Sequence, residues 1–207
     1  MSDFYPILLR LKEKPVLVIG GGQVAERKVK SLLMYGAKVF LVSKELTHKL
    51  QELVKEKKIV FLGQDFYDSY LKDKLLLIVA TNDPLLNKHI AEKGRQKGIL
   101  VNVVDQPSDC DFIVPSVVKR GDLIISISTS GKSPFISRKI RERLESLYGP
   151  EYRILLDIMA TVRKALIRAG EQHKEKIYEK LYDSDILSKI KMKDVEDVVK
   201  IIAEALC

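Results

Sequence analysis

The chain has 207 residues, of which 46% are hydrophobic and 31% are charged, and its formal net charge is +8 at pH 7. This composition is ordinary for a globular protein with a substantial core. No apolar run approaches the roughly 18 residues that a membrane-spanning helix needs, and the first residues lack the pattern of a signal peptide. Two cysteines, Cys110 and Cys207, are too few for a disulfide framework. We therefore expect a cytoplasmic protein that does not enter membranes.

The excess of positive charge has three explanations: nucleic acid, a small polyanionic substrate, or lysine-rich solvated helix surfaces. The sequence contains no Trp, no zinc-ligand spacing and no aromatic signature of RNA binding, so we predict no nucleic-acid partner. The segment 119–143 stands out because it holds seven basic and only two acidic residues. A polyanionic substrate and solvated helix surfaces both remain open for this segment.

A triple glycine between a strand pattern and a helix pattern is the most informative motif near the start of the chain. The apolar residues 16–19 predict a buried parallel strand, and helical spacing begins after the glycines. Gly20 permits a tight turn, and Gly22 permits close approach to a pyrophosphate. Ala25, in place of a third glycine, permits close packing of helix on strand. With the anion site at the helix N-terminus, the motif predicts a bound dinucleotide, and the alternative is a purely structural glycine turn.

The remaining elements alternate in type as far as residue 104. Strands are predicted at 38–42, 59–62, 75–80 and 99–104, and helices from the glycine turn to residue 35, at 44–57 and at 84–97. This succession predicts an α/β fold with a parallel sheet. Beyond Pro115 the pattern changes: one more strand is predicted at 122–128, followed by helices at 133–147, 155–167, 177–187 and 195–206.

Polar residues follow the carboxyl ends of the predicted strands, which is where ligands bind in open parallel sheets. They are Ser43, Lys44 and Glu45, then Thr81, Asn82 and Asp83, and finally Asp105. Each is also an ordinary turn or helix-cap residue. Partial burial would raise the pKa of Asp105 toward that of a general base. Lys44 stands near the usual place of a ribose-binding acid and tolerates a 2′-phosphate, so the residues leave NAD or NADP open.

The segment 127–134 is a loop rich in hydroxyl groups that opens a helix at Ser133-Pro134. Its many donors favour a carboxylate-binding cradle. It is not a Walker loop, because Ser126 stands where the first glycine of that motif is required. The helix that follows carries an apolar stripe that includes Phe135, Ile136 and Ile140. This stripe fits either a dimer interface or an ordinary intrachain core.

Four motifs in register resemble one family. They are Gly-Gly-Gly-x-Val-Ala-x-Arg-Lys at 20–28, Val-Asn-Val-Val-Asp at 101–105, Cys-Asp-Phe-x-x-Pro-Ser at 110–116 and Ser-Thr-x-Gly-x-Ser-Pro at 128–134. In this order and spacing the chain resembles the precorrin-2 dehydrogenase family, the dehydrogenase–ferrochelatase part of siroheme synthase. The resemblance implies oxidation of precorrin-2 to sirohydrochlorin with NAD⁺, and in some members insertion of ferrous iron. It also implies a homodimer, with a Rossmann domain at 1–113, a dimerisation segment at 114–149 and a helical domain at 150–207.

The glycine motif and the resemblance together predict the site residues. Cofactor contacts are expected at Gly20, Gly22, Gln23, Val24, Ala25, Lys44, Glu45, Thr81 and Asn82. Substrate contacts are expected at Thr129, Ser130, Gly131, Lys132 and Ser133, with Thr129 in place of a frequent serine. The resemblance makes Asp105 the catalytic residue that accepts a proton, and it gives the basic segment 119–143 a substrate with eight carboxylates.

No metal site is predicted, because His48, His89 and His173 are widely scattered. Two alternative functions remain: a basic nucleic-acid-binding protein, and an NAD(H)-sensing regulatory module without catalysis. Such a module would need the glycine motif but neither Asp105 nor the hydroxyl-rich loop.

Overall fold

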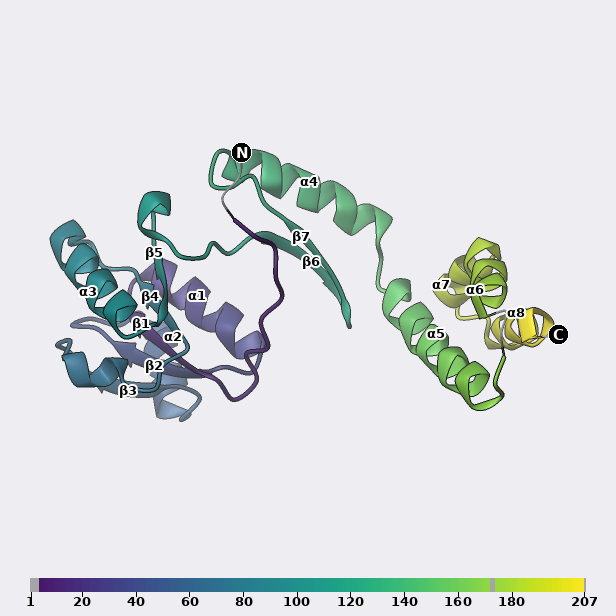
Figure 1. Ribbon diagram of the computed structural model, residues 1–207, viewed down its shortest axis with the longest axis horizontal. Helices are drawn as coiled ribbons and strands as arrows, with labels where there is room; N and C mark the ends of the chain where they lie inside the picture. The colour runs from purple at the N-terminus through teal and green to yellow at the C-terminus, as the bar shows by residue number, and fades with distance from the viewer. Residues whose placement is uncertain (1–3, 172–173, 207) are drawn as a thin grey trace. The chain divides into compact units, whose positions relative to one another are not determined.

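The computed structural model describes residues 4–171 and 174–206, which form two compact units that divide between Val114 and Pro115. The first unit is a five-stranded parallel sheet in the order β3-β2-β1-β4-β5 (Figure 1). Its strands are β1 (Pro15–Ile19), β2 (Lys38–Val42), β3 (Val60–Gly63), β4 (Leu76–Val79) and β5 (Leu100–Val103). Its helices are α1 (Gln23–Met34), α2 (His48–Lys55) and α3 (Pro84–Gln96), with 3-10 turns at Asp68–Leu71 and Pro107–Asp109. The predicted α/β fold with a parallel sheet is confirmed.

Alternation along the strands builds a core on each face of this sheet. Val16 and Val18 of β1 pack with α1 and α2 on one face, whereas Leu17 and Ile19 pack with α3 on the other. Successive residues of a strand point to opposite faces, so a continuous apolar run marks a strand that is covered on both sides. β1 is the central strand and pairs with β2 on one side and with β4 on the other. The strand order therefore reverses at β1, where the glycine turn begins.

The second unit joins a two-stranded hairpin to a set of helices. The antiparallel strands are β6 (Ser116–Arg120) and β7 (Leu123–Ile127), followed by α4 (Pro134–Leu147), α5 (Glu151–Arg168), α6 (Lys174–Asp183), α7 (Ile186–Met192) and α8 (Val195–Leu206). Arg120 fastens the hairpin to α4, because its guanidinium donates to the carbonyl oxygens of Glu145 (3.2 Å) and Tyr148 (2.8 Å). A separate apolar cluster joins α5 to α8. His173 and Cys207 lie outside the described residues.

Four sequence predictions were wrong in detail, and one of them is the helix predicted at 155–167, which already begins at Glu151. The helix predicted at 44–57 begins only at His48, because the side chain of Thr47 caps it by accepting from the amide of Leu50. The single strand predicted at 122–128 is one half of a hairpin whose other strand, 116–120, had been missed. The helix predicted at 177–187 is two helices, α6 and α7. They are separated at Ser184, whose hydroxyl bonds to the backbone of Leu181 and Ile186.

Candidate functional site

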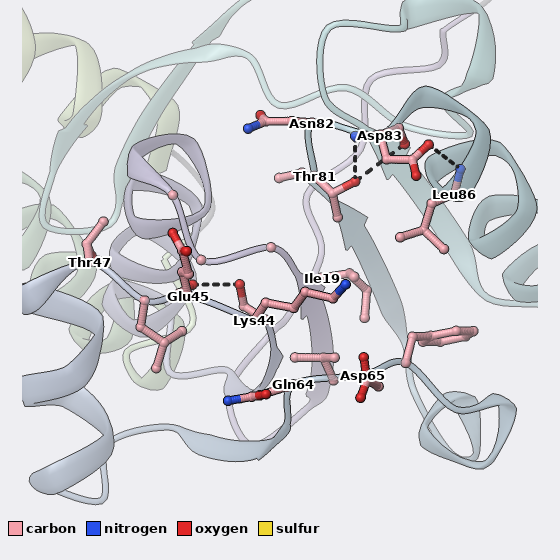
Figure 2. A pocket seen from close by; sticks show the side chains of 18 of the residues that line it. Ile19, Lys44, Glu45, Thr47, Gln64, Asp65, Thr81, Asn82, Asp83 and Leu86 are labelled. Carbon is pink, nitrogen blue, oxygen red and sulfur yellow. Dashed lines mark hydrogen bonds between the residues drawn. The ribbon is translucent and has the colours of Figure 1, made fainter.

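A pocket of about 1120 Å³ opens at the carboxyl edge of the sheet in the first unit (Figure 2). Its walls come from the loops that follow β1, β2, β3 and β4, together with α3 and the 3-10 turn before β4. Polar and charged groups supply much of the lining: Ser43, Lys44, Glu45, Thr47, Gln64, Asp65, Asp68, Thr81, Asn82, Asp83 and His89. Drug-sized ligands occupy clefts of about 300–1,000 Å³, so this pocket has room for a larger ligand.

The glycine turn forms the middle of the pocket wall. Gly20 has φ +116°, and a Cβ atom there would lie 2.3 Å from the main-chain oxygen of Ala80. A Cβ atom on Gly21 would lie 2.0 Å from the main-chain oxygen of Glu45. Gly22 differs from both, because a Cβ atom on it would meet no protein atom within 4 Å. The first two glycines are therefore required by the fold, and the third keeps open space in front of α1.

The N-terminus of α1 offers backbone donors to that open space. Gly22 is the N-cap residue and brings no side chain to bond the first amides of the helix. Unsatisfied amides and the positive end of the helix dipole form a ready-made site for a phosphate group. The site fits the pyrophosphate of a dinucleotide, because the residue nearest to it adds no side-chain bulk.

The loop after β2 is held against the glycine turn by hydrogen bonds. The amide of Thr47 donates to the oxygen of Gly21 (3.0 Å), and the hydroxyl of Ser43 donates to the oxygen of Glu45 (2.7 Å). The hydroxyl of Thr47 donates to Glu26 of α1 (2.7 Å), so α1 and the start of α2 are joined directly. In Figure 2 the side chain of Lys44 extends across the opening from this loop.

The loop after β4 forms the opposite wall and is held by α3. Asp83 caps α3 by accepting from the amide of Leu86 (3.0 Å). The amide of Asp83 donates to the hydroxyl of Thr81 (3.2 Å). The side chain of Asn87, which is only 4% exposed, bonds to Thr81 through both its nitrogen and its oxygen. Thr81 is therefore held in one orientation at the pocket wall.

Acidic groups outnumber basic ones around the pocket. Four carboxylates line it, at Glu45, Asp65, Asp68 and Asp83, against the single ammonium group of Lys44. A hydrogen bond from Lys93 (3.0 Å) lowers the pKa of Asp68, and this keeps the carboxylate charged. Lys93 offsets the charge of Asp68, and the remaining carboxylates make the pocket unfavourable for a ligand with extra negative charge.

The structure brings most of the predicted cofactor residues together. Six of them line the pocket: Gly20, Gly22, Lys44, Glu45, Thr81 and Asn82. Gln23, Val24 and Ala25 are not among the lining residues and form the first turn of α1. The side chain of Ala25 is fully buried against the sheet, which fits its expected part in helix–strand packing. Cofactor contacts through the side chains or amides of this turn remain predictions.

Asp105 does not line the pocket. It is exposed, not partly buried as expected, and it has φ +61°, a left-handed conformation that Asp adopts more readily than most residues. It follows β5, and the amide of the preceding Val104 donates to Val79 of β4 (2.9 Å). Asp105 therefore lies at the same edge of the sheet as Thr81, one strand away.

Lys28 is a charged neighbour of Asp105 to which we assigned no role from the sequence. It comes from α1 and is half-buried, and burial lowers its pKa from the ordinary value. The charges of Cys110 and Asp105 act in the opposite direction. Helix α1 therefore carries the phosphate site at its N-terminus and also holds the Lys28 ammonium group near the Asp105 carboxylate.

The predicted substrate loop lies in the second unit, between β7 and α4. Ser130 and Gly131 both have positive φ, at 52° and 82°. The hydroxyl of Thr129 accepts from the amide of Ser133 (3.0 Å), and Ser133 in turn caps α4. Lys132 is exposed. The loop is thus built by its own hydroxyl groups, and its role in substrate binding remains a prediction.

A family model described as putative NAD(P)-binding matches residues 7–116. The chain belongs to this family. A second model, described as sirohaem biosynthesis protein central, matches residues 120–147. The first match covers the glycine turn and all the lining residues of the pocket, so the pocket is that of an NAD(P)-binding fold. No helix in the described ranges has the length and apolar character needed to span a bilayer.

Individual relatives agree with these models. Siroheme synthase of Vesicomyosocius okutanii subsp. Calyptogena okutanii is 35% identical over 190 residues, which cover 91% of this chain and 41% of that protein. Siroheme synthase of Psychromonas ingrahamii is 38% identical over 194 residues, or 92% and 41% of the two chains. The solved structure of SirC, a precorrin-2 dehydrogenase, matches with a TM-score of 0.76 and 26% identity over 95% of this chain and 100% of that one. The resemblance to the N-terminal part of siroheme synthase is thereby confirmed, and the chain spans about two fifths of those synthases.

Sequence reasoning missed several residues of the pocket. Gly21 had no assigned role, although it makes the closest approach in the turn. Asp65 and Asp68, which follow β3, line the pocket but were not among the predicted site residues. The polar residues after the end of β3 were a usable signal, because parallel strands share one carboxyl edge. Asn87 does not line the pocket but bonds to Thr81, which does; it lies inside a predicted helix, and nothing in its spacing distinguishes it from a surface residue.

Proposed function

We propose that this protein oxidises precorrin-2 to sirohydrochlorin with NAD⁺ as the hydride acceptor. The observation that carries the proposal is the glycine turn, whose first two residues the fold requires and whose third leaves open space before the N-terminus of α1. The name of the SirC structure, precorrin-2 dehydrogenase, supports the choice of substrate. The oxidation removes one hydride and one proton from the tetrapyrrole, and NAD⁺, when bound, would accept the hydride.

The chain's own residues have three tasks in this reaction. The first turn of α1 holds the pyrophosphate, and the loops after β2 and β4 hold the two nucleosides on either side of it. Asp105 accepts the proton, directly or through water, because its carboxylate is exposed at the same sheet edge. The hydroxyl-rich loop 128–133 and the basic groups near it bind the carboxylates of the tetrapyrrole. Alignment of the two ring systems is the main contribution to catalysis.

The charge of the pocket supports NAD⁺ over NADP⁺. A 2′-phosphate would add negative charge to a pocket lined by four carboxylates and one lysine. Lys44, together with Lys93 paired to Asp68, offsets only part of that repulsion. We expect the affinity for NAD⁺ to exceed that for NADP⁺ at low ionic strength.

We also propose that α4 mediates a homodimer. Four large apolar residues on this helix are exposed in the single chain: Phe135, Ile136, Ile140 and Leu147, at 59%, 50%, 41% and 62%. An exposed apolar stripe of this kind is typical of an interface between subunits. We propose the cytoplasm as the place of action, because two cysteines are too few for a disulfide framework.

Anaerobic incubation with precorrin-2 and NAD⁺ tests the proposal. Appearance of the sirohydrochlorin spectrum together with NADH supports it. Binding of NAD⁺ without turnover would instead favour the NAD(H)-sensing module. Ferrous iron added to the same cuvette tests metal insertion, for which iron is a substrate; in the described ranges no group of three or more His, Cys, Asp or Glu residues could hold a metal ion.

A further inference from the structure

The side chain of Asn87 is a buried polar group whose hydrogen bonds all go to one pocket residue. Its nitrogen donates to the main-chain oxygen of Thr81 (3.0 Å), and its oxygen accepts from the hydroxyl of Thr81 (2.5 Å). Burying an amide is costly unless its partners are supplied. An apolar residue would fill the same place on α3 without that cost, so the amide serves to orient Thr81.

The carbonyl group of Thr81 fixes the orientation of the Asn87 amide. A carbonyl oxygen only accepts hydrogen bonds, so the nitrogen of Asn87 must face it. The amide oxygen must then face the hydroxyl of Thr81, which has only one proton to donate. That proton is committed to Asn87, because the other acceptor in range, the oxygen of Asp83, is farther away at 3.4 Å.

Thr81 therefore presents only acceptor capacity to a ligand. One lone pair of its hydroxyl accepts from the amide of Asp83 (3.2 Å), and the other remains for a donor in the pocket that Thr81 lines. We infer that Asn87 is a positioning residue that turns the Thr81 hydroxyl into an acceptor for a hydrogen-bond donor on the nicotinamide half of the cofactor. This inference rests on the proposed function.

The place of Thr81 in the sheet decides which half of the cofactor it meets. The pyrophosphate lies at the turn after β1, and in folds of this type the adenosine ribose is bound at the end of β2. Thr81 follows β4, on the other side of β1. The donor is therefore the amino group of the carboxamide or a hydroxyl of the nicotinamide ribose.

Titration calorimetry of the full chain with NAD⁺ and with AMP, which carries only the adenosine half, tests the inference. T81V removes the hydroxyl and keeps the side-chain shape, and N87A removes both amide groups. We expect each to weaken NAD⁺ binding about tenfold, the value of one hydrogen bond near the upper end of the usual range. AMP affinity should change by less than about twofold. T81S, which keeps the hydroxyl, should bind as the wild type does.

The double variant separates positioning from a general structural effect. If Asn87 acts through Thr81, N87A combined with T81V weakens NAD⁺ binding no more than about threefold beyond T81V alone. Asn102 supplies a matched control, because it is equally buried at 5% and bonds to Phe112, away from the pocket. N102A should leave the ratio of NAD⁺ to AMP affinity unchanged. If N87A does not fold, N87L takes its place, because its branched apolar side chain fills the space and removes both amide groups.

An NAD⁺ analogue in which an acetyl group replaces the carboxamide distinguishes the two candidate donors. If wild-type protein prefers NAD⁺ over this analogue and T81V does not, the carboxamide is the donor. If wild-type protein and T81V prefer NAD⁺ over the analogue to the same extent, the donor is a ribose hydroxyl. The inference, but not the proposed function, would be overturned if the double variant bound NAD⁺ about a hundredfold more weakly than wild type, the product of the two single effects. It would also be overturned if the variants lost AMP affinity as much as NAD⁺ affinity. Wild-type protein that binds neither NAD⁺ nor AMP would overturn the proposed function and the inference with it.

Discussion

The main-chain oxygen of Glu45 lies 2.0 Å from the position that a Cβ atom on Gly21 would take. The two residues belong to neighbouring loops, after β1 and after β2, and the amide of Thr47 fastens those loops by donating to Gly21. Backbone therefore lies directly against backbone at the centre of the pocket wall. No rotation of a side chain relieves a clash of this kind.

The glycine turn provides a pair of matched substitutions. Gly21→Ala forces the two loops apart, and we expect the free energy of unfolding to fall by about 1–3 kcal/mol. Gly22→Ala meets open space and has φ −78°, which alanine adopts freely. It should therefore leave thermal stability nearly unchanged while weakening NAD⁺ binding about tenfold or more, because its methyl group enters the pyrophosphate space. Thermal unfolding and calorimetry measure both effects, and equal NAD⁺ affinity in Gly22→Ala would place the pyrophosphate elsewhere.

Asp105 is tested best with asparagine. Asp105→Asn keeps the size of the side chain and tolerates the left-handed backbone at φ +61°, but it cannot take a proton. We expect turnover of precorrin-2 to fall about a hundredfold or more, with the dissociation constant for NAD⁺ unchanged because Asp105 lies outside the pocket lining. Asp105→Ala serves as the comparison, since it adds backbone strain. Full activity in Asp105→Asn would remove this carboxylate from the mechanism.

Lys132 tests the electrostatic part of substrate binding. The side chain is exposed at the end of the hydroxyl-rich loop. Lys132→Gln should raise KM for the polyanionic tetrapyrrole about two- to fivefold and leave kcat unchanged, as expected for one exposed charge pair. Added salt should raise KM in the wild type more than in the variant. Lys139 is a suitable control, because it is already paired with Glu142 at 2.9 Å.

The reactivity of the Cys110 thiol should depend on pH and on folding. Burial raises the pKa of its thiol above the ordinary value of 9.0, although a backbone hydrogen bond at Val103 and the charge of Lys28 oppose the effect. Because only the thiolate reacts, native protein at pH 8 should be alkylated more slowly than unfolded protein. A Cys207→Ser background leaves Cys110 as the only thiol to measure.

The same raised pKa fixes the sign of the effect on stability. A group that holds its proton more tightly in the folded state contributes stability below its unfolded pKa and loses that contribution as the pH rises through the folded value. The stability advantage of wild type over Cys110→Ser should therefore shrink above about pH 9. An advantage that grows with pH would show that the thiolate, not the thiol, is stabilised in the fold.

The sequence predicted β1, β2 and β4 well because they are nearly continuous apolar runs, which are typical of a strand covered on both faces. Gly20, Lys44 and Thr81 were found as pocket residues because they stand just after such runs. The hairpin strand 116–120 was missed because it has only two apolar residues, Val117 and Val118, which are followed directly by two basic residues. The importance of Gly21 depends on Glu45, and that of Asn87 depends on the path of the loop after β4. Contacts between residues far apart in the chain leave no periodic signal.

Every residue that lines the pocket lies between Ile19 and His89, well before the division of the chain at Val114. The nucleotide-holding part is therefore a self-contained cassette with its own core. Gain, loss or exchange of the segment after Val114 by gene fusion would therefore leave the residues that line the nucleotide pocket unchanged.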